Sequence, residues 1–261
     1  MTVLPHDAHG VGPTLVLLHA FPLDRSLWDG VASPVAAAGW QVLVPDLPGF
    51  GADDEPAASI DAMADRVAEL LQRRSVHSAV IGGCSLGGYV ALAFAEHYPE
   101  QTAGLILVDT KASADDDAAR ANRARIAEQV ERSGSTAALA ATQADALLAP
   151  VTRARHPEVA VWLHDTVLAQ RPATVAATQR AMAARPARFD ALRALRVPVL
   201  CMRGADDRIA SAADQAAMVA AAGDALDVTL PDAGHLLPVE QPQAVVDQVV
   251  AFLAQVRGPV C

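Results

Sequence analysis

Six short apolar runs recur along the chain, and each is continuous instead of alternating between apolar and polar residues. A strand reads this way when a parallel sheet is covered on both faces, because neither side of the strand then meets water. Two segments outside the runs, 59–74 and 242–256, repeat their apolar residues every three to four positions, as a helix with one buried face does. The alternation predicts a doubly wound, mostly parallel α/β sheet. The expected strands are 15–18, 41–44, 79–81, 104–108, 198–202 and 227–230.

The alternation is interrupted between residues 111 and 190, a stretch that is rich in alanine and contains no run suited to a strand. Glycine and proline divide it into segments that are typical of helices, which we place at 118–132, 135–148, 158–169 and 173–184. We therefore expect one α/β core domain, formed by residues 1–110 and 191–261, and a helical insertion formed by residues 111–190.

The chain is acidic, because 30 Asp and Glu against 20 Lys and Arg give a formal net charge of -10. Nucleic acids and anionic membranes bind clustered positive charge, so neither is an expected partner. The apolar runs stay well below the roughly 18 residues of a spanning helix, and residues 1–10 do not read as a signal peptide. Three cysteines, Cys84, Cys201 and Cys261, do not suit a disulfide framework. We therefore expect a cytoplasmic protein.

The segment Gly-Cys-Ser-Leu-Gly at 83–87 fits the Gly-x-Ser-x-Gly pattern of a nucleophile elbow. It follows an expected strand and precedes an apolar helical run at 89–97. The pattern needs this context, because a sharp strand-to-helix turn holds the serine hydroxyl exposed. The first turn of such a helix also directs free N–H groups toward developing negative charge. We therefore expect Ser85 to act as a nucleophile.

A serine hydroxyl needs a base to take its proton, and His235 is the best placed of eight histidines. It lies in the loop between the last expected strand and the C-terminal helix, at the carboxyl end of the sheet, where such folds gather ligand-facing groups. The base needs a carboxylate to fix its tautomer. Asp206 and Asp207 both follow strand 198–202 directly, and Asp109, at the end of strand 104–108, is a third candidate.

A tetrahedral intermediate needs backbone N–H groups that are preorganised to bind its oxyanion. One of them should belong to Leu86, directly after the nucleophile, and the other to the loop at 19–22, where we choose Phe21. Trp28 and Trp162 are candidates for the lining of the substrate pocket, although packing in the core is the more common role of tryptophan.

Signatures of bound metals and nucleotides do not occur in the sequence. There is no His-Glu-x-x-His and no Cys-x-x-Cys, and the glycines at 49–51 lack the third glycine of a dinucleotide-binding loop. We therefore expect no metal and no cofactor.

Five motifs in order resemble the α/β-hydrolase superfamily over about residues 14–256: 19–22 (His-Ala-Phe-Pro), 46–51 (Asp-Leu-Pro-Gly-Phe-Gly), 83–88 (Gly-Cys-Ser-Leu-Gly-Gly), 204–207 (Gly-Ala-Asp-Asp) and 234–235 (Gly-His). More narrowly, they are similar to its small cofactor-free serine branch of arylesterases, perhydrolases, enol-lactonases and carrier-protein methyl ester esterases. The order Ser, Asp, His is that of the superfamily. The resemblance implies that the fourth residue of Gly-x-x-Asp is the acid, which selects Asp207. It also implies an α/β-hydrolase fold with a helical lid inserted after the sixth strand.

Two positions depart from the pattern of the family. Ala20 replaces the usual glycine of the oxyanion loop, and Ala52 replaces a serine after the second glycine-rich turn. Neither belongs to the expected triad. The resemblance implies a serine hydrolase that cleaves a small-molecule carboxylic ester or lactone through an acyl-enzyme. A C–C bond hydrolase, a perhydrolase and a thioesterase use the same triad and stay open as alternatives, as does a ligand-sensing protein on the same fold. The oligomeric state and the acyl and alcohol groups stay open too.

Overall fold

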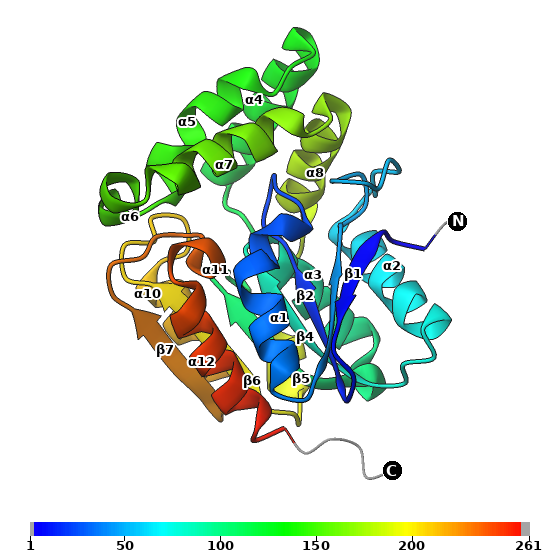
Figure 1. Ribbon diagram of the computed structural model, residues 1–261. Coiled ribbons are helices and arrows are strands. Elements are labelled where there is room, and N and C mark those ends of the chain that lie inside the picture. Colours follow the sequence, from blue (N-terminus) through cyan, green and yellow to red (C-terminus); the bar gives the residue numbers. More distant parts are fainter. Residues whose placement is uncertain (1–2, 257–261) are drawn as a thin grey trace.

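The computed structural model describes residues 3–256, so Cys261 lies outside the described residues, while Cys84 and Cys201 are buried and free. Within this range seven strands form one sheet in the order β1-β3-β2-β4-β5-β6-β7 (Figure 1). All the expected strands are present. The strands are β1 (His6–His9), β2 (Thr14–Leu18), β3 (Gln41–Pro45), β4 (Ala79–Cys84), β5 (Thr102–Val108), β6 (Val199–Gly204) and β7 (Ala225–Leu230).

Strand β1 is the one strand that the apolar runs do not indicate. It pairs antiparallel with β3 at the edge of the sheet, and every other pairing is parallel. Its sequence, His-Asp-Ala-His, is polar because both faces of this edge strand are partly or fully exposed. The mostly parallel α/β sheet expected from the sequence is confirmed.

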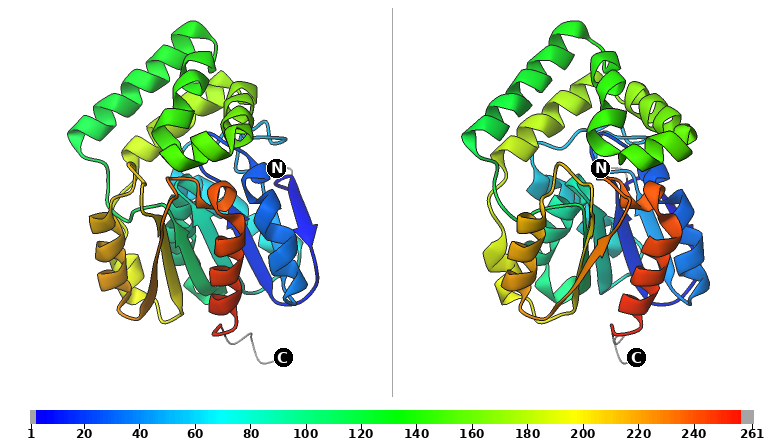
Figure 2. Two further views of the ribbon diagram at one scale, coloured as in Figure 1. Left: turned by 60° about the vertical axis from the view of Figure 1, so that its left-hand side comes forward. Right: turned by 90° about the vertical axis from the view of Figure 1, so that its left-hand side faces the viewer.

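Helices cover both faces of the sheet (Figures 1 and 2). Strand β2 shows how its side chains are divided: Leu15 and Leu17 pack into one apolar cluster, and Val16 and Leu18 pack into the other. Because both faces are buried, the run is apolar throughout. One face carries α1 (Asp29–Ala37) and α12 (Pro242–Leu253), and the other carries α2 (Ile60–Arg73), α3 (Leu86–His97), α9 (Phe189–Ala194) and α10 (Ala212–Ala222).

The helical insertion lies above the carboxyl ends of the strands, between β5 and β6 in the chain (Figures 1 and 2). It contains the four expected helices and one more, α6, whose six residues are too few to show a period. Helix α4 packs along α8, and α5 packs along α7. The helices are α4 (Asp117–Ser133), α5 (Ala137–Leu147), α6 (Pro150–Arg155), α7 (Pro157–Ala169) and α8 (Pro172–Ala184).

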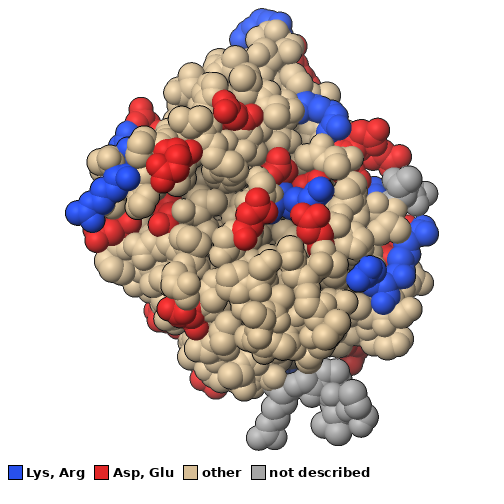
Figure 3. Space-filling model, viewed as in Figure 1, with Lys and Arg blue, Asp and Glu red and all other residues tan. Residues whose placement is uncertain are grey.

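The insertion begins after Val108, as expected, but β5 is the fifth strand of the described chain. The expectation that the insertion follows the sixth strand is therefore wrong in its count, because a single antiparallel strand precedes the parallel ones within residues 3–256. Acidic and basic side chains are interspersed on the face shown in Figure 3. None of the helices in residues 3–256 has the length and apolarity needed to cross a bilayer.

Candidate active site

Ser85 occupies the single position between strand β4 and helix α3, with φ 52° and ψ −107°. A positive φ is unfavourable for a residue with a side chain, and it persists only where neighbouring contacts enforce it. Two such contacts come from the end of β5: Ser85 N–H donates to the carbonyl of Val108 at 2.9 Å, and the Thr110 hydroxyl donates to the carbonyl of Ser85 at 2.8 Å. Hydrogen bonds to both the N–H and the carbonyl of Ser85 thus hold the elbow in place.

The glycines of the elbow are needed for close backbone packing. A Cβ atom on Gly83 would lie 2.1 Å from the carbonyl carbon of Gly87, and one on Gly87 would lie 2.2 Å from the carbonyl oxygen of Leu18. Real Cβ atoms do not approach so closely, so any larger residue would push α3 away from the sheet. The Gly-x-Ser-x-Gly spacing follows directly from this geometry.

The side chains of Ser85, His235 and Asp207 converge at the carboxyl end of the sheet. His235 Nε2 lies 2.8 Å from Ser85 Oγ, and His235 Nδ1 lies 2.9 Å from Asp207 Oδ2. Since the carboxylate only accepts, Nδ1 carries the proton and Nε2 is free to accept from the serine hydroxyl. All three residues are buried, with Ser85 9% exposed. Residues 150 positions apart are thus in hydrogen-bond contact.

Of the three candidate acids, Asp207 is the one that contacts His235. Its other oxygen, Oδ1, accepts from the N–H groups of Ile209 and Ala210. Asp206 is exposed. Asp109 is buried and accepts instead from two backbone N–H groups, those of Gly204 and Leu237.

Asp207 and His235 stabilise each other's charged forms, whereas Asp207 and Asp109 repel. Burial works to raise the pKa of Asp207, but the charge and hydrogen bond of His235 outweigh burial, and the pKa is lowered. Burial likewise works to lower the pKa of His235, but Asp207, with smaller contributions from Asp109 and Glu240, holds it above its ordinary value. For Asp109 burial dominates, followed by the charge of Asp207, and its pKa rises to about 8.

The two N–H groups expected to bind an oxyanion are free for that role. Leu86 is the first residue of α3, and Phe21 lies in the loop after β2. Neither N–H donates to a protein acceptor within residues 3–256. The first N–H groups of a helix have no partner within the helix, so that of Leu86 is available to a ligand.

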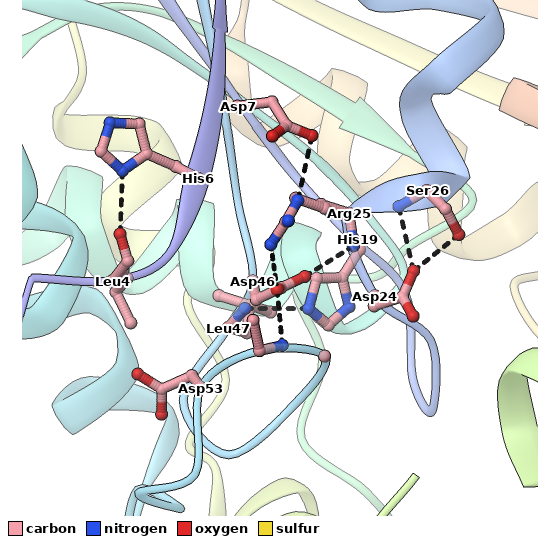
Figure 4. Close-up of polar contacts among 12 residues, drawn as sticks. Leu4, His6, Asp7, His19, Asp24, Arg25, Ser26, Asp46, Leu47 and Asp53 are labelled. Carbon is pink, nitrogen blue, oxygen red and sulfur yellow. Dashed lines mark hydrogen bonds and ion pairs between the residues drawn. The ribbon is translucent and has the colours of Figure 1, made fainter. Parts of the chain in front are cut away.

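His19 holds the loop that carries Phe21. Its Nε2 accepts from Leu47 N–H at 2.9 Å, so its Nδ1 carries the proton and donates to the carbonyl of Ala20 at 2.9 Å. Figure 4 shows how the ring joins this loop to the segment that follows β3. Arg25 adds a second connection between the same two segments, because it forms an ion pair with the buried Asp46.

The two tryptophans have different surroundings. Trp28 is 1% exposed and packs in an apolar cluster that includes residues of α1, of the sheet and of the insertion, so a role in the substrate pocket stays a prediction. Trp162, on α7, is half-buried, and its Nε1 donates to Ser26 Oγ at 3.3 Å. It borders a cavity between α7 and the core whose lining does not include Ser85.

Thr110 and Glu240 contact the site although no motif marks them in the sequence. Thr110 binds the carbonyl of Ser85, and Glu240 binds N–H groups on both sides of His235. Their positions were the one signal available: Thr110 is the second residue after a parallel strand, and Glu240 lies five residues after His235. Among residues 3–256, His, Cys, Asp and Glu side chains form no group of three or more that suits a metal ion.

In a comparison of the sequence with protein families, the alpha/beta hydrolase fold family matches residues 13–242. The chain belongs to this family. A thermophilic esterase from Thermogutta terrifontis superimposes with a TM-score of 0.93 at 39% sequence identity, over 97% of this chain and 93% of that one. The enol-lactonase from Burkholderia xenovorans superimposes with a TM-score of 0.88 at 23% identity, over 97% and 96% of the two chains, and shows a shared fold.

Two curated relatives match a shorter stretch of the present chain. Lipase 3 from Moraxella sp. is 35% identical over 103 residues, which is 38% of this chain and 32% of the lipase. The pimeloyl-[acyl-carrier protein] methyl ester esterase from Aromatoleum aromaticum is 37% identical over 98 residues, 38% of this chain and 37% of the esterase. The match thus spans about a third of the length of these relatives.

Proposed function

We propose that this α/β hydrolase is a carboxylic ester hydrolase that works through an acyl-enzyme on Ser85. The observation that carries the proposal is the unbroken chain of hydrogen bonds from Ser85 Oγ through His235 to Asp207. The resemblance to an esterase at 39% identity over nearly the whole chain supports the same class of substrate.

In the first half of the reaction, Ser85 Oγ attacks the ester carbonyl carbon while its proton passes to His235 Nε2. The carbonyl electrons move to the oxygen, which the N–H groups of Phe21 and Leu86 bind. Asp207 stabilises the imidazolium that forms. The intermediate collapses, the C–O bond to the alcohol breaks, and His235 returns the proton to the leaving alkoxide.

In the second half, a water molecule gives a proton to His235 and attacks the acyl carbon. The same N–H groups bind the oxyanion, the bond to Ser85 Oγ breaks, and His235 restores the serine hydroxyl. The products are an alcohol and a carboxylic acid. A lactone is an ester whose alcohol is tethered to its acyl group, so the same steps open its ring.

We assign residues 1–110 and 191–261 to the catalytic core domain and residues 111–190 to a lid. The helices of this insertion lie over the carboxyl ends of the strands (Figure 2). The burial of Ser85 and His235 supports a lid that excludes bulk water and limits the size of the substrate.

The test is hydrolysis of p-nitrophenyl acetate together with labelling by a fluorophosphonate probe. Wild-type protein should turn over the ester and carry the label on Ser85, and Ser85→Ala should do neither. Ser133→Ala, an exposed serine of the insertion, is the matched control and should behave as wild type. Ligand binding without turnover would favour a sensor, and turnover of thioesters or peracid formation in preference to ester hydrolysis would redirect the assignment within the family.

A further inference from the structure

Glu240 ends the short helix α11 (Leu237–Glu240), and its half-buried carboxylate accepts four hydrogen bonds. Its Oε1 accepts from the N–H groups of Gly234, at 2.9 Å, and Leu236, at 3.1 Å. Its Oε2 accepts from the N–H of Ala149 at 2.8 Å and the hydroxyl of Thr152 at 2.7 Å. The two oxygens thus serve two different parts of the chain.

The donors to Oε1 are the residues directly before and after His235. The donors to Oε2 belong to the helical insertion, where α5 ends and α6 begins. In Figure 1, α6 lies above the loops at the carboxyl ends of β6 and β7. One planar group therefore connects the loop of the expected base to the insertion.

Two direct contacts between the same segments support this connection. His235 N–H donates to the carbonyl of Leu147 at 2.7 Å. A Cβ atom on Gly234 would lie 2.6 Å from the carbonyl oxygen of Leu147 and 2.7 Å from the nitrogen of Ala149. The glycine before the histidine thus lets the backbone of the insertion pass against the loop.

The donor set of Glu240 requires a carboxylate. All four partners donate, and a carboxylate accepts at both ends, whereas the amide of glutamine would direct an NH₂ group at one pair of donors. Hydrogen bonds to a charged acceptor are also stronger than those to a neutral one. The charge acts on the base as well: burial lowers the pKa of His235, Asp207 raises it most, and Asp109 and Glu240 add to that rise.

We propose that Glu240 is a positioning residue that couples the helical insertion to His235, so that the base is held in line with Ser85 when the insertion is seated on the core. The inference rests on the proposed function. In this role Glu240 does not contact the substrate. A substitution in the insertion that disturbs the carboxylate of Glu240 should therefore alter the reactivity of Ser85.

The measurement is the second-order rate of fluorophosphonate labelling of Ser85 as a function of pH, together with kcat and KM for p-nitrophenyl acetate. Glu240→Gln should slow labelling and lower kcat about tenfold with little change in KM, since it disturbs the geometry of the base and not the binding of substrate. It should also move the acid limb of the pH profile to lower pH, because a negative charge near His235 is lost. A residue that only stabilised the fold would not move that limb.

Thr152→Val tests the contact of Glu240 with the insertion. It removes one donor to Oε2 and keeps the two hydrogen bonds to Oε1. It should slow labelling about threefold without shifting the acid limb. In the Glu240→Gln background the same change should have no further effect, since the coupling group is already disrupted. Two controls are matched: Glu100→Gln removes an exposed carboxylate far from the site, and Thr142→Val removes an exposed hydroxyl of α5 that bonds within its own helix.

The outcomes separate this inference from the proposed function. A wild-type protein that is never labelled at Ser85 would refute the proposed function, and the coupling with it. A labelled wild type whose rate and pH profile are unchanged in Glu240→Gln would refute the positioning role alone. Additive effects of Glu240→Gln and Thr152→Val would show that the loop and the insertion act independently, and would overturn the coupling.

Discussion

Gly204 packs so closely against Gly234 that a Cβ atom on Gly204 would lie 2.0 Å from the carbonyl oxygen of Gly234. Asp207 follows the first glycine by three residues, and His235 follows the second directly. The contact of the two backbones therefore sets the separation of the proposed acid and base.

Gly204→Ala should force these two loops apart. We expect a loss of about 1–3 kcal/mol in the free energy of unfolding, as overpacking of a filled interior commonly costs, and a larger proportional loss in kcat/KM. Thermal unfolding and ester hydrolysis measure the two effects. Gly104→Ala in β5 is the control, because a Cβ atom there meets nothing closer than 3.4 Å. Equal losses of activity in both variants would contradict this explanation of the glycine.

Asp207→Asn should lower kcat about 10⁴-fold with little change in stability, because an amide no longer holds His235 in the tautomer that accepts from Ser85. Asp206→Asn, at the exposed neighbouring position, is the matched control and should retain wild-type activity. Steady-state ester hydrolysis distinguishes the two. An inactive Asp206→Asn beside an active Asp207→Asn would move the acid to the other residue.

The pH dependence of kcat/KM should report the neutral form of His235. Asp207, with a smaller contribution from the charge of Glu240, overcomes the effect of burial and raises the pKa of His235, so the protonated, inactive form persists to a higher pH than for an ordinary histidine. Activity should therefore fall as the pH drops through a midpoint above 6.5. A midpoint below that value would mean that burial outweighs the carboxylates.

Asp109 should make the protein less stable as the pH rises. Burial, followed by the charge of Asp207, raises its pKa in the folded protein from an ordinary value of 3.8 to about 8. The stability that the bound proton provides is complete below pH 3.8 and is lost progressively up to about pH 8. Asp109→Asn does not titrate, so its free energy of unfolding relative to wild type should increase between pH 4 and pH 8. Parallel curves in urea titrations at several pH values would refute the shift.

The N–H of Leu86 is testable without changing any side chain that packs in the core. Replacement of Leu86 by its α-hydroxy acid analogue converts the N–H to an ester oxygen, and kcat should fall about 10²–10³-fold, the usual effect of removing one oxyanion donor. The same replacement at Ala212, the first residue of α10, is the control and should leave kcat unchanged. Unaltered turnover at Leu86 would exclude its N–H from the oxyanion site.

Sequence alone was sufficient for the parts of the fold in which burial dictates residue type. Strand β2 reads as a strand because both of its faces are covered, whereas the exposed edge strand β1 carries no such signal. The convergence of Ser85 and His235 could be expected because the elbow and the histidine loop each follow a strand and carry small residues at fixed spacing, and the family resemblance added Asp207. Asp206 and Asp207 could not be separated by spacing, since both follow the same strand.

What the sequence could not provide depends on contacts between distant segments. Trp28 gives the same sequence signal in a pocket and in a core, and its burial in an apolar cluster depends on tertiary packing. Glu240 and Thr152 lie in different parts of the chain, and neither has a partner that local pattern indicates. The absence of strand-like runs located the insertion in the sequence. Its position on the core depends on contacts between distant segments, such as that of Thr152 with Glu240.

The pairing of β5 with β6 spans the whole helical insertion, since Leu105 lies beside Val199. The proposed nucleophile and base are therefore synthesised far apart in time. Ser85 emerges early, while Asp207 and His235 follow only after the seven helices α3 to α9 have been synthesised. The proposed acid and base are thus absent from the nascent chain for most of its translation, and Ser85 can be activated only once both have been added.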